Sequence, residues 1–273
     1  MEYLAISVLL LLIIVLLSEA ARRTTLKFFA RKDYAVYLLE IISTFQLCAC
    51  THELKLLGEV GQIEPQIGLT LTYTTTVVHA LTFRGALCNP SGALEHIYRG
   101  NLTGKRALAR IACQFIAAVL ARLVILEVWA LELSDLHLKH KSLGFKCTSP
   151  IHTVLLKAVA VELACAFAVQ TAVTHLNRLD EKYRALFIAA VVTFLVYAGG
   201  SFTGAVFNPV LAFSIQFPCS GNTFLEYSLV YGVGPVLGVA FSVLLFDKII
   251  PLLSGKSTYE RGADIAGIKD KMA

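Results

Sequence analysis

Residues 83–90 read Phe-Arg-Gly-Ala-Leu-Cys-Asn-Pro, and residues 202–209 read Phe-Thr-Gly-Ala-Val-Phe-Asn-Pro. Both octapeptides fit the pattern Phe-x-Gly-Ala-x-x-Asn-Pro, and their Asn residues lie 119 positions apart (208 − 89). A single Asn-Pro pair is an ordinary way to begin a turn. Two copies within matching octapeptides instead indicate an internal repeat that organises the chain.

A second pair of matched positions supports this repeat. Glu40 precedes Phe45, and Glu162 precedes Phe167 by the same interval, each early in an apolar stretch. Each half of the chain holds three such stretches. Because three is an odd number, the second half must enter a membrane from the opposite face. The pattern therefore predicts an inverted repeat in which the two Asn-Pro copies approach each other from opposite sides.

The composition is that of an integral membrane protein. Hydrophobic residues make up 56% of the 273 residues, and charged residues make up 16%, below the ~25% of a soluble domain. A helix needs about 20 apolar residues to cross the hydrocarbon core. A short first run is followed by six core spans, and the seven ranges are 4–17, 34–57, 67–83, 107–131, 153–176, 185–197 and 227–246.

The net charge is +5. Cytosolic loops of membrane proteins carry an excess of Lys and Arg, so we use these residues to orient the chain in the membrane and do not read them as a nucleic-acid-binding surface. The stretches predicted to be cytosolic are 22–32, 99–106, 178–184 and the tail from 248. Those predicted to lie outside, which lack Lys and Arg, are 58–66 and 199–226. One loop disagrees, since Lys139, Lys141 and Lys146 fall in a connection assigned to the outside.

The first apolar run, 4–17, has two interpretations. Its shortness and its position resemble a signal peptide. Against cleavage, Glu2 stands where a signal peptide carries positive charge, and Arg22 and Arg23 follow the run. We expect a retained anchor, which would place the N-terminus outside.

Each Asn-Pro copy predicts the start of a short helix. Asn is favoured at the N-cap because its side-chain oxygen accepts from free N–H groups, and Pro suits the first helical position. The residues after Asn89 and Asn208 are too few or too interrupted for another full span. Each helix should therefore stop halfway through the membrane, where it must line a cavity or be buried in protein. Two helix N-termini, each with roughly half a positive charge, would then face each other, welcome water and repel cations and protons.

These features resemble the aquaporin family. The resemblance rests on the paired Asn-Pro boxes, the two early acids and the sequence Gly-Gly-Ser-Phe-Thr-Gly at 199–204. More narrowly, 129–138 and 219–227 look like the twelve type of the divergent superaquaporin branch, and 44–48 and 194–200 look like its eleven type. The resemblance implies an all-α membrane protein with an inverted repeat of three plus three spans, two re-entrant half-helices, an extra N-terminal apolar segment and homotetramers.

Carried over residue by residue, the resemblance defines two pore boxes, Asn89-Pro90-Ser91 and Asn208-Pro209-Val210. The third residue is Ala in the family, so Ser91 and Val210 should alter the width and packing beside the Asn pair. The selectivity filter falls on Val196, Ala205 and Leu211, and ordinary members carry Arg at the position of Leu211. Because all three are apolar, the outer constriction should be more hydrophobic and wider.

The intramembrane acids Glu40 and Glu162 are expected to be structural, fastening the loop before each half-helix, in preference to relaying protons. His52, Glu53 and His79 could suggest a metal or a catalytic base, but no second cluster at ligand spacing accompanies them. The sequence carries no nucleophile with a base and no phosphate loop. We therefore predict no enzyme, no metal and no cofactor.

Two smaller patterns concern structure. Cys147 and Cys219 lie in loops predicted on the same side, which leaves a disulfide open, while the other five cysteines are read mainly as small packing residues. Gly234 and Gly238 form a Gly-x-x-x-Gly face that lets helices approach closely.

The predicted organisation is an N-terminal anchor and basic linker (1–33), a channel domain (34–250, with halves 34–131 and 152–250) and a cytosolic tail (251–273). The predicted function is passive conduction, across a lipid bilayer, of water and small neutral solutes such as glycerol or hydrogen peroxide. The alternative is a structural membrane protein that keeps the fold without useful conduction, suggested by Leu211 and the altered boxes. A secondary transporter would share the inverted repeat but would normally carry charged groups at mid-membrane.

The last residues suggest a location. Lys269 and Lys271 stand fifth and third from the end, the spacing of a dilysine retrieval signal. Together with the resemblance to superaquaporins, this spacing favours the endoplasmic reticulum.

Overall fold

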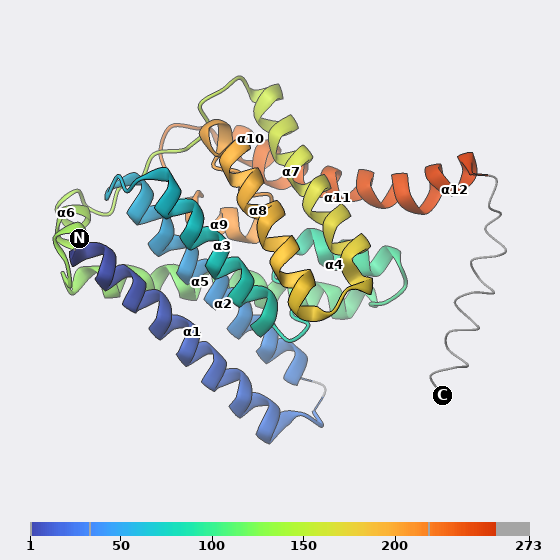
Figure 1. The fold of residues 1–273 in the computed structure, drawn as a ribbon, viewed down its shortest axis with the longest axis horizontal. Coiled ribbons are helices and arrows are strands. Elements are labelled where there is room, and N and C mark those ends of the chain that lie inside the picture. The colour runs from blue at the N-terminus through green and yellow to red at the C-terminus, as the bar shows by residue number, and fades with distance from the viewer. Residues whose placement is uncertain (1, 33, 218, 255–273) are drawn as a thin grey trace.

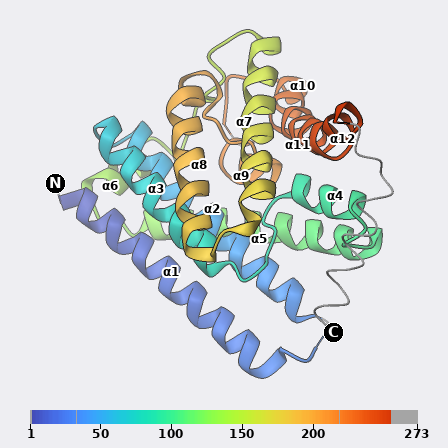
Figure 2. The same cartoon turned by 45° about the vertical axis from the view of Figure 1, so that its right-hand side comes forward.

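The protein is a bundle of helices, and the part of the chain that the structure describes contains no β-strand. This computed structural model describes residues 2–32, 34–217 and 219–254, so the predicted retrieval lysines lie outside it. In both Figure 1 and Figure 2, α1 lies along α2 at the edge of the bundle. The α-helices are α1 Glu2–Phe29, α2 Ala35–Glu59, α3 Pro65–Thr82, α4 Pro90–Tyr98, α5 Gly104–Ala130, α6 Asp135–Ser142, α7 Leu155–His175, α8 Glu181–Thr203, α9 Pro209–Ile215, α10 Phe224–Tyr227, α11 Gly234–Leu244 and α12 Ile250–Leu253.

Every apolar run expected from the sequence forms helix. Within the described residues, six helical stretches are long and apolar enough to cross a membrane: Glu2–Phe29, Ala35–Glu59, Gly104–Ala130, Leu155–Arg178, Glu181–Thr203 and Phe224–Leu253. The expected span 67–83 forms α3, which is not among the six because its threonines lower its mean hydropathy. The all-α fold with an extra N-terminal helix is confirmed.

The N-terminal helix is longer than expected and docks through polar contacts. α1 continues through Arg22, Arg23 and Lys27, the stretch expected to be a linker, because the guanidinium of Arg22 is buried and bonded. Its Nη2 donates to Gln46 Oε1 at 2.7 Å, and at the other end of α1 Ser7 Oγ donates to Glu53 Oε1 at 2.5 Å. These bonds join α1 to α2 at both ends, which a loosely held anchor would lack.

Two spans differ in their limits from the sequence expectation. The expected span 185–197 continues to Thr203, and Gly204, with φ of 80°, ends α8 in the left-handed region. The last span is a succession of α10, α11 and α12 joined by wider π-helical turns at Ser228–Val233 and Leu245–Ile249. The sequence did not indicate these π-helical turns, because they do not follow the regular spacing of apolar residues expected of an α-helix.

Small residues set the distance between α7 and α11. A Cβ added at Gly238 would collide with the carbonyl oxygen of Leu163, and one at Gly234 would lie 3.1 Å from the carbonyl oxygen of Val159. The backbones of the two helices therefore touch at these glycines. The Gly-x-x-x-Gly face packs helices as expected.

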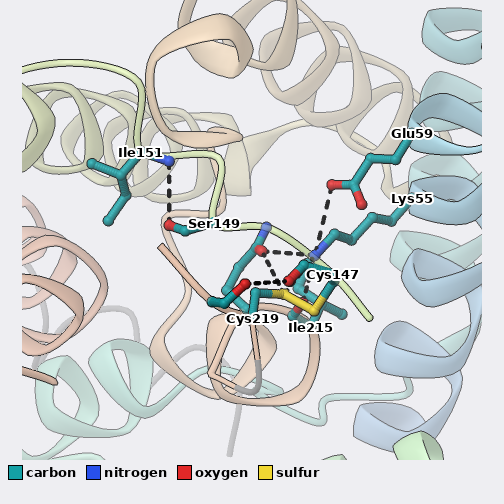
Figure 3. Close-up of a disulfide and its surroundings, with 9 residues drawn as sticks. Lys55, Glu59, Cys147, Ser149, Ile151, Ile215 and Cys219 are labelled. Atoms are coloured by element: carbon teal, nitrogen blue, oxygen red, sulfur yellow. Dashed lines mark hydrogen bonds and ion pairs between the residues drawn. A yellow bond between two sulfur atoms is a disulfide. The ribbon is translucent and has the colours of Figure 1, made fainter. Parts of the chain in front are cut away.

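A disulfide joins two loops at one end of the bundle. Cys147 and Cys219 are bonded, with Cα atoms 4.7 Å apart, and Figure 3 shows the bond beside Lys55 and Ile215. The possibility that the sequence left open is therefore realised. In the same region, Lys141 of α6 pairs with Glu132 and also donates to the carbonyl of Ala130.

Candidate pore

The two half-helices begin as the Asn-Pro boxes predict. The Oδ1 atom of Asn89 accepts from the backbone N–H of Ser91 at 2.9 Å, and α4 follows with Pro90 in its first turn. The Oδ1 atom of Asn208 accepts from Val210 at 3.1 Å and from Leu211 at 3.4 Å, and α9 follows. Both Asn side chains therefore cap short helices, of nine and seven residues, that are far too short to cross a membrane.

Each loop that enters a half-helix is held by a buried carboxylate. Glu40 accepts from the backbone N–H groups of Leu87 and Cys88, with the shortest bond at 2.7 Å. Glu162 accepts in the same way from Val206, at 3.0 Å, and Phe207, at 2.5 Å. Glu40 in the first half of the repeat and Glu162 in the second half therefore make corresponding contacts.

The carboxylates hold an unusual backbone. Cys88 and Phe207, the residues just before each Asn, have φ angles of 52° and 39°, in the left-handed region that non-glycine residues rarely adopt. Such residues persist only where their surroundings over-determine them. The two hydrogen bonds to each carboxylate supply this constraint, and the conformation turns each Asn into its capping position.

A direct bond joins the two boxes. The Nδ2 atom of Asn208 donates to the carbonyl oxygen of Cys88 at 2.8 Å. The boxes therefore approach closely enough to bond each other, and this N–H group of Asn208 is not free for a solute. Among the described residues, the structure records no acceptor for the Nδ2 atom of Asn89, so that amide is available to a solute.

One cavity of about 730 Å³ brings together most of the predicted pore residues. Its wall includes both box asparagines and the whole predicted filter: Asn89, Asn208, Val196, Ala205 and Leu211. The other box residues, Pro90, Ser91, Pro209 and Val210, are not part of the wall. Ser91 and Val210 are almost fully buried beside the cavity. They can therefore affect the packing behind the Asn pair and not the cavity wall itself.

The α3 side of the cavity carries hydroxyl groups that the sequence analysis did not single out, beside His79, which it did. Thr72, Thr75 and Thr76 line it, and each hydroxyl donates back to a carbonyl of its own helix, which leaves oxygen lone pairs as acceptors. His79 also lines the cavity, and its ring stacks on Phe83 with centroids 5.0 Å apart. The run Thr-Leu-Thr-Tyr-Thr-Thr-Thr at 70–76 was the available signal.

A charged pair on the cavity wall was also missed in the sequence analysis. Lys55 and Glu59, from the last turns of α2, line the cavity near the disulfide, with Nζ and Oε1 3.7 Å apart. His52, one turn away, bonds Ser214 at 3.0 Å and is a satisfied buried histidine. The residues described by the structure contain no group of three or more side chains able to hold a metal ion.

Glu53 has a structural environment. Its carboxylate accepts from Trp129 Nε1 at 2.7 Å and from Ser7, and it lies 3.3 Å from His137 Nε2. All of these groups are buried, and they join α1, α2, α5 and α6. Glu53 therefore binds the bundle together and is not part of the wall of the large cavity.

The sequence of this chain is similar to those of known proteins. Residues 56–246 match the family described as major intrinsic protein. Aquaporin-11 of Homo sapiens is 39% identical over 225 residues, which cover 82% of this chain and 82% of that protein. Aquaporin-12 of Mus musculus is 35% identical over 232 residues, which cover 84% of this chain and 80% of that protein.

The fold of a solved structure agrees as well. The aquaglyceroporin from Plasmodium falciparum matches with a TM-score of 0.58 at 13% identity, over 80% of this chain and 99% of that one. At this identity the likeness shows a common fold. The family match covers most of the sequence, and the capped half-helices lie where the repeat predicts them. The chain therefore belongs to the major intrinsic protein family, with aquaporin-11 and aquaporin-12 among its relatives.

Proposed function

We propose that this protein is a passive membrane channel that conducts water and small neutral solutes, with glycerol and hydrogen peroxide as the solutes to test. Its membership of the aquaporin family supports a channel function and favours a role other than catalysis. The observation that carries the proposal is that one cavity, of about 730 Å³, has both box asparagines and the three filter residues in its wall.

The chemistry of this wall suits neutral, hydrogen-bonding solutes. The Nδ2 atom of Asn89 offers a donor, and the hydroxyl oxygens of Thr72 and Thr75 offer acceptors. The N-termini of α4 and α9 each add a partial positive charge that disfavours cations. A neutral solute can exchange hydrogen bonds with such a wall without losing the hydration energy of an ion.

The apolar filter favours solutes larger than water. Val196, Ala205 and Leu211 carry no hydrogen-bonding side-chain group and line a cavity of about 730 Å³. A water molecule takes up roughly 30 Å³ of the liquid. The cavity therefore has room for molecules of the size of glycerol, and its apolar wall does not penalise their carbon atoms.

The alternative is a structural membrane protein with this fold and no useful conduction. One contact favours it, because the bond from Asn208 Nδ2 to the Cys88 carbonyl removes a donor from the pathway. The apolar Leu211 favours it as well, since a hydrophobic constriction can exclude water. A measurement of permeability separates the two functions.

We propose an orientation with the C-terminus in the cytosol. Disulfides persist in oxidising compartments. The bond between Cys147 and Cys219 therefore supports placing their loops in the lumen of the endoplasmic reticulum, on the side opposite to the basic loops. Assembly into homotetramers is proposed from the family alone, and cross-linking in native membranes would test it.

The test is stopped-flow light scattering on proteoliposomes under gradients of sucrose and of glycerol, with peroxide uptake as a third readout. The double variant Asn89→Asp, Asn208→Asp keeps both capping oxygens but places negative charge in the pathway. Asn101→Asp, the same substitution at an exposed loop position, is the matched control. Circular dichroism and gel filtration verify the fold of each protein.

The channel proposal expects permeability above that of empty liposomes for the parent and for Asn101→Asp, with loss in the double variant. Permeability equal to that of empty liposomes for all three solutes, with the parent folded, would contradict it. That second result would favour the structural role.

A further inference from the structure

The cavity wall carries a cation that its filter lacks. Val196, Ala205 and Leu211 are apolar, but Lys55 of α2 reaches the same cavity from another helix. The half-helix α9 connects the two positions, because Leu211 lies four residues before Ile215, or ~6 Å along a helix. The ammonium group of Lys55 bonds at Ile215, so it lies about one helical turn from the filter.

The ammonium group is held in place at the end of α9. Its Nζ donates to the carbonyl oxygen of Ile215 at 2.7 Å and to Gln216 Oε1 at 2.7 Å, and it lies 3.3 Å from the Sγ atom of Cys219. Figure 3 shows the side chain extending from α2 toward Ile215 and the disulfide. A Lys held by three acceptors is a fixed charge and not a mobile surface side chain.

The charge of Lys55 is only partly balanced. The nearest carboxylate, Glu59, lies 3.7 Å away, and its side chain is 44% exposed, against 13% for Lys55. The other acceptors are neutral. Both residues line the cavity, and water screens the more exposed acid more than the cation, so the charge of Lys55 is only partly neutralised there.

We propose that Lys55 determines the charge selectivity of the pore, supplying from α2 a fixed positive charge that excludes cations at the disulfide end of the cavity. This inference deepens the proposed function and rests on it. A neutral solute can accept a hydrogen bond from the wall beside Lys55, whereas a sodium or potassium ion meets a like charge. The apolar filter alone presents no such charge.

A purely structural role makes a different prediction. If Lys55 only ties α2 to α9, the positive charge itself has no effect on the passage of ions. A second cation placed elsewhere on the same wall would then repair nothing. Lys55→Met removes the charge and keeps an unbranched side chain, Lys55→Arg keeps the charge, and Leu211→Arg adds a charge at the filter.

The experiment measures sodium uptake and glycerol permeability in the same proteoliposomes. Parent, Lys55→Met, Lys55→Arg and the double variant Lys55→Met, Leu211→Arg are compared. Arg122→Met is the matched control, because Arg122 lines a small neighbouring cavity of about 50 Å³, which Lys55 also borders, and does not line the large one. Val196→Trp in the Lys55→Met background tests whether any leak passes through the cavity.

We expect sodium uptake to rise by about tenfold or more in Lys55→Met, because a charge barrier in a low-dielectric passage is lost. Sodium uptake in Lys55→Arg and in Arg122→Met should equal that of the parent. The double variant should regain the barrier, and Val196→Trp should abolish the leak.

Sodium uptake in Lys55→Met equal to that of the parent would overturn the inference. A sodium leak in Lys55→Met that is not reduced by adding Leu211→Arg would overturn it as well. Sodium uptake still tests the inference if the parent passes no neutral solute and the proposed function fails. In that case, a sodium leak through the cavity in Lys55→Met still supports the charge barrier. No sodium leak in Lys55→Met overturns it.

Discussion

The side-chain amide of Asn208 donates to the backbone carbonyl of Cys88, with Nδ2 and O 2.8 Å apart. The two residues come from different halves of the repeat and stand 120 positions apart (208 − 88). This bond fastens the start of one half-helix to the loop that enters the other. The geometry of the pore therefore depends on both loops keeping their shape.

Replacing either loop-holding carboxylate by its amide should weaken the fold. Glu40→Gln and Glu162→Gln each leave one acceptor oxygen and place an NH₂ group opposite backbone N–H groups in a buried site. We expect a loss of about 1–3 kcal/mol in the free energy of unfolding for each. Thermal unfolding in detergent measures it, with the exposed acid variant Glu127→Gln as the control. Unchanged melting for both variants would show that the carboxylates do not hold the loops.

The N-terminal helix should remain in the mature protein. Arg22 and Ser7 bond α2 at two separate points, and Glu19 pairs at 2.9 Å with Arg84, five residues before Asn89. Removing α1 would leave Gln46 and Glu53 buried without these partners. Intact-mass spectrometry of protein purified from its native membrane should give the mass of the chain with residues 2–29 present. A mass lower by this segment would contradict the prediction.

The contact between α7 and α11 should tolerate no side chain at Gly238. Gly238→Ala places a Cβ against the Leu163 carbonyl and should cost about 1–3 kcal/mol, the usual range for overpacking. Gly232→Ala is the matched control, because a Cβ there meets nothing within 4 Å. Melting temperatures in detergent compare the two. Equal stability for both variants would mean that the helices are not packed closely at Gly238.

The disulfide should protect two of the seven cysteines from alkylation. Maleimide labelling of the denatured, unreduced chain should modify the five free cysteines, and reduction before labelling should expose all seven. Mass spectrometry counts the labels. Seven labels without reduction would show that Cys147 and Cys219 are thiols in the membrane, and the argument for a lumenal location of their loops would then fail.

The sequence predicted the parts of this fold that local chemistry determines. Asn before Pro caps a helix wherever the backbone is free to turn, so Asn89 and Asn208 marked both half-helices. The two matching octapeptides revealed the repeat, and the matched positions of Glu40 and Glu162 supported it. Runs of apolar residues indicated the spans, because hydrophobicity and length decide insertion before any tertiary contact forms.

Contacts between distant residues were not predictable from the sequence in the same way. The burial of Arg22 depends on Gln46, the anchoring of Lys55 depends on the carbonyl at the end of α9, and the bond of Asn208 depends on the turn at Cys88. Each needs the packed bundle to exist. Composition alone suggested a linker at Arg22 and gave no role to Lys55.

The central claim is that solutes pass through the cavity between the half-helices, and blocking that cavity tests it most directly. Val196→Trp places a large ring on its wall, whereas Phe194→Trp, two residues away on the same helix, alters a side chain that is 65% exposed on the outside of α8. Stopped-flow measurements on proteoliposomes should show water and glycerol permeability lost in Val196→Trp and retained in Phe194→Trp. Equal permeability in folded preparations of the two variants would contradict a pathway through this cavity.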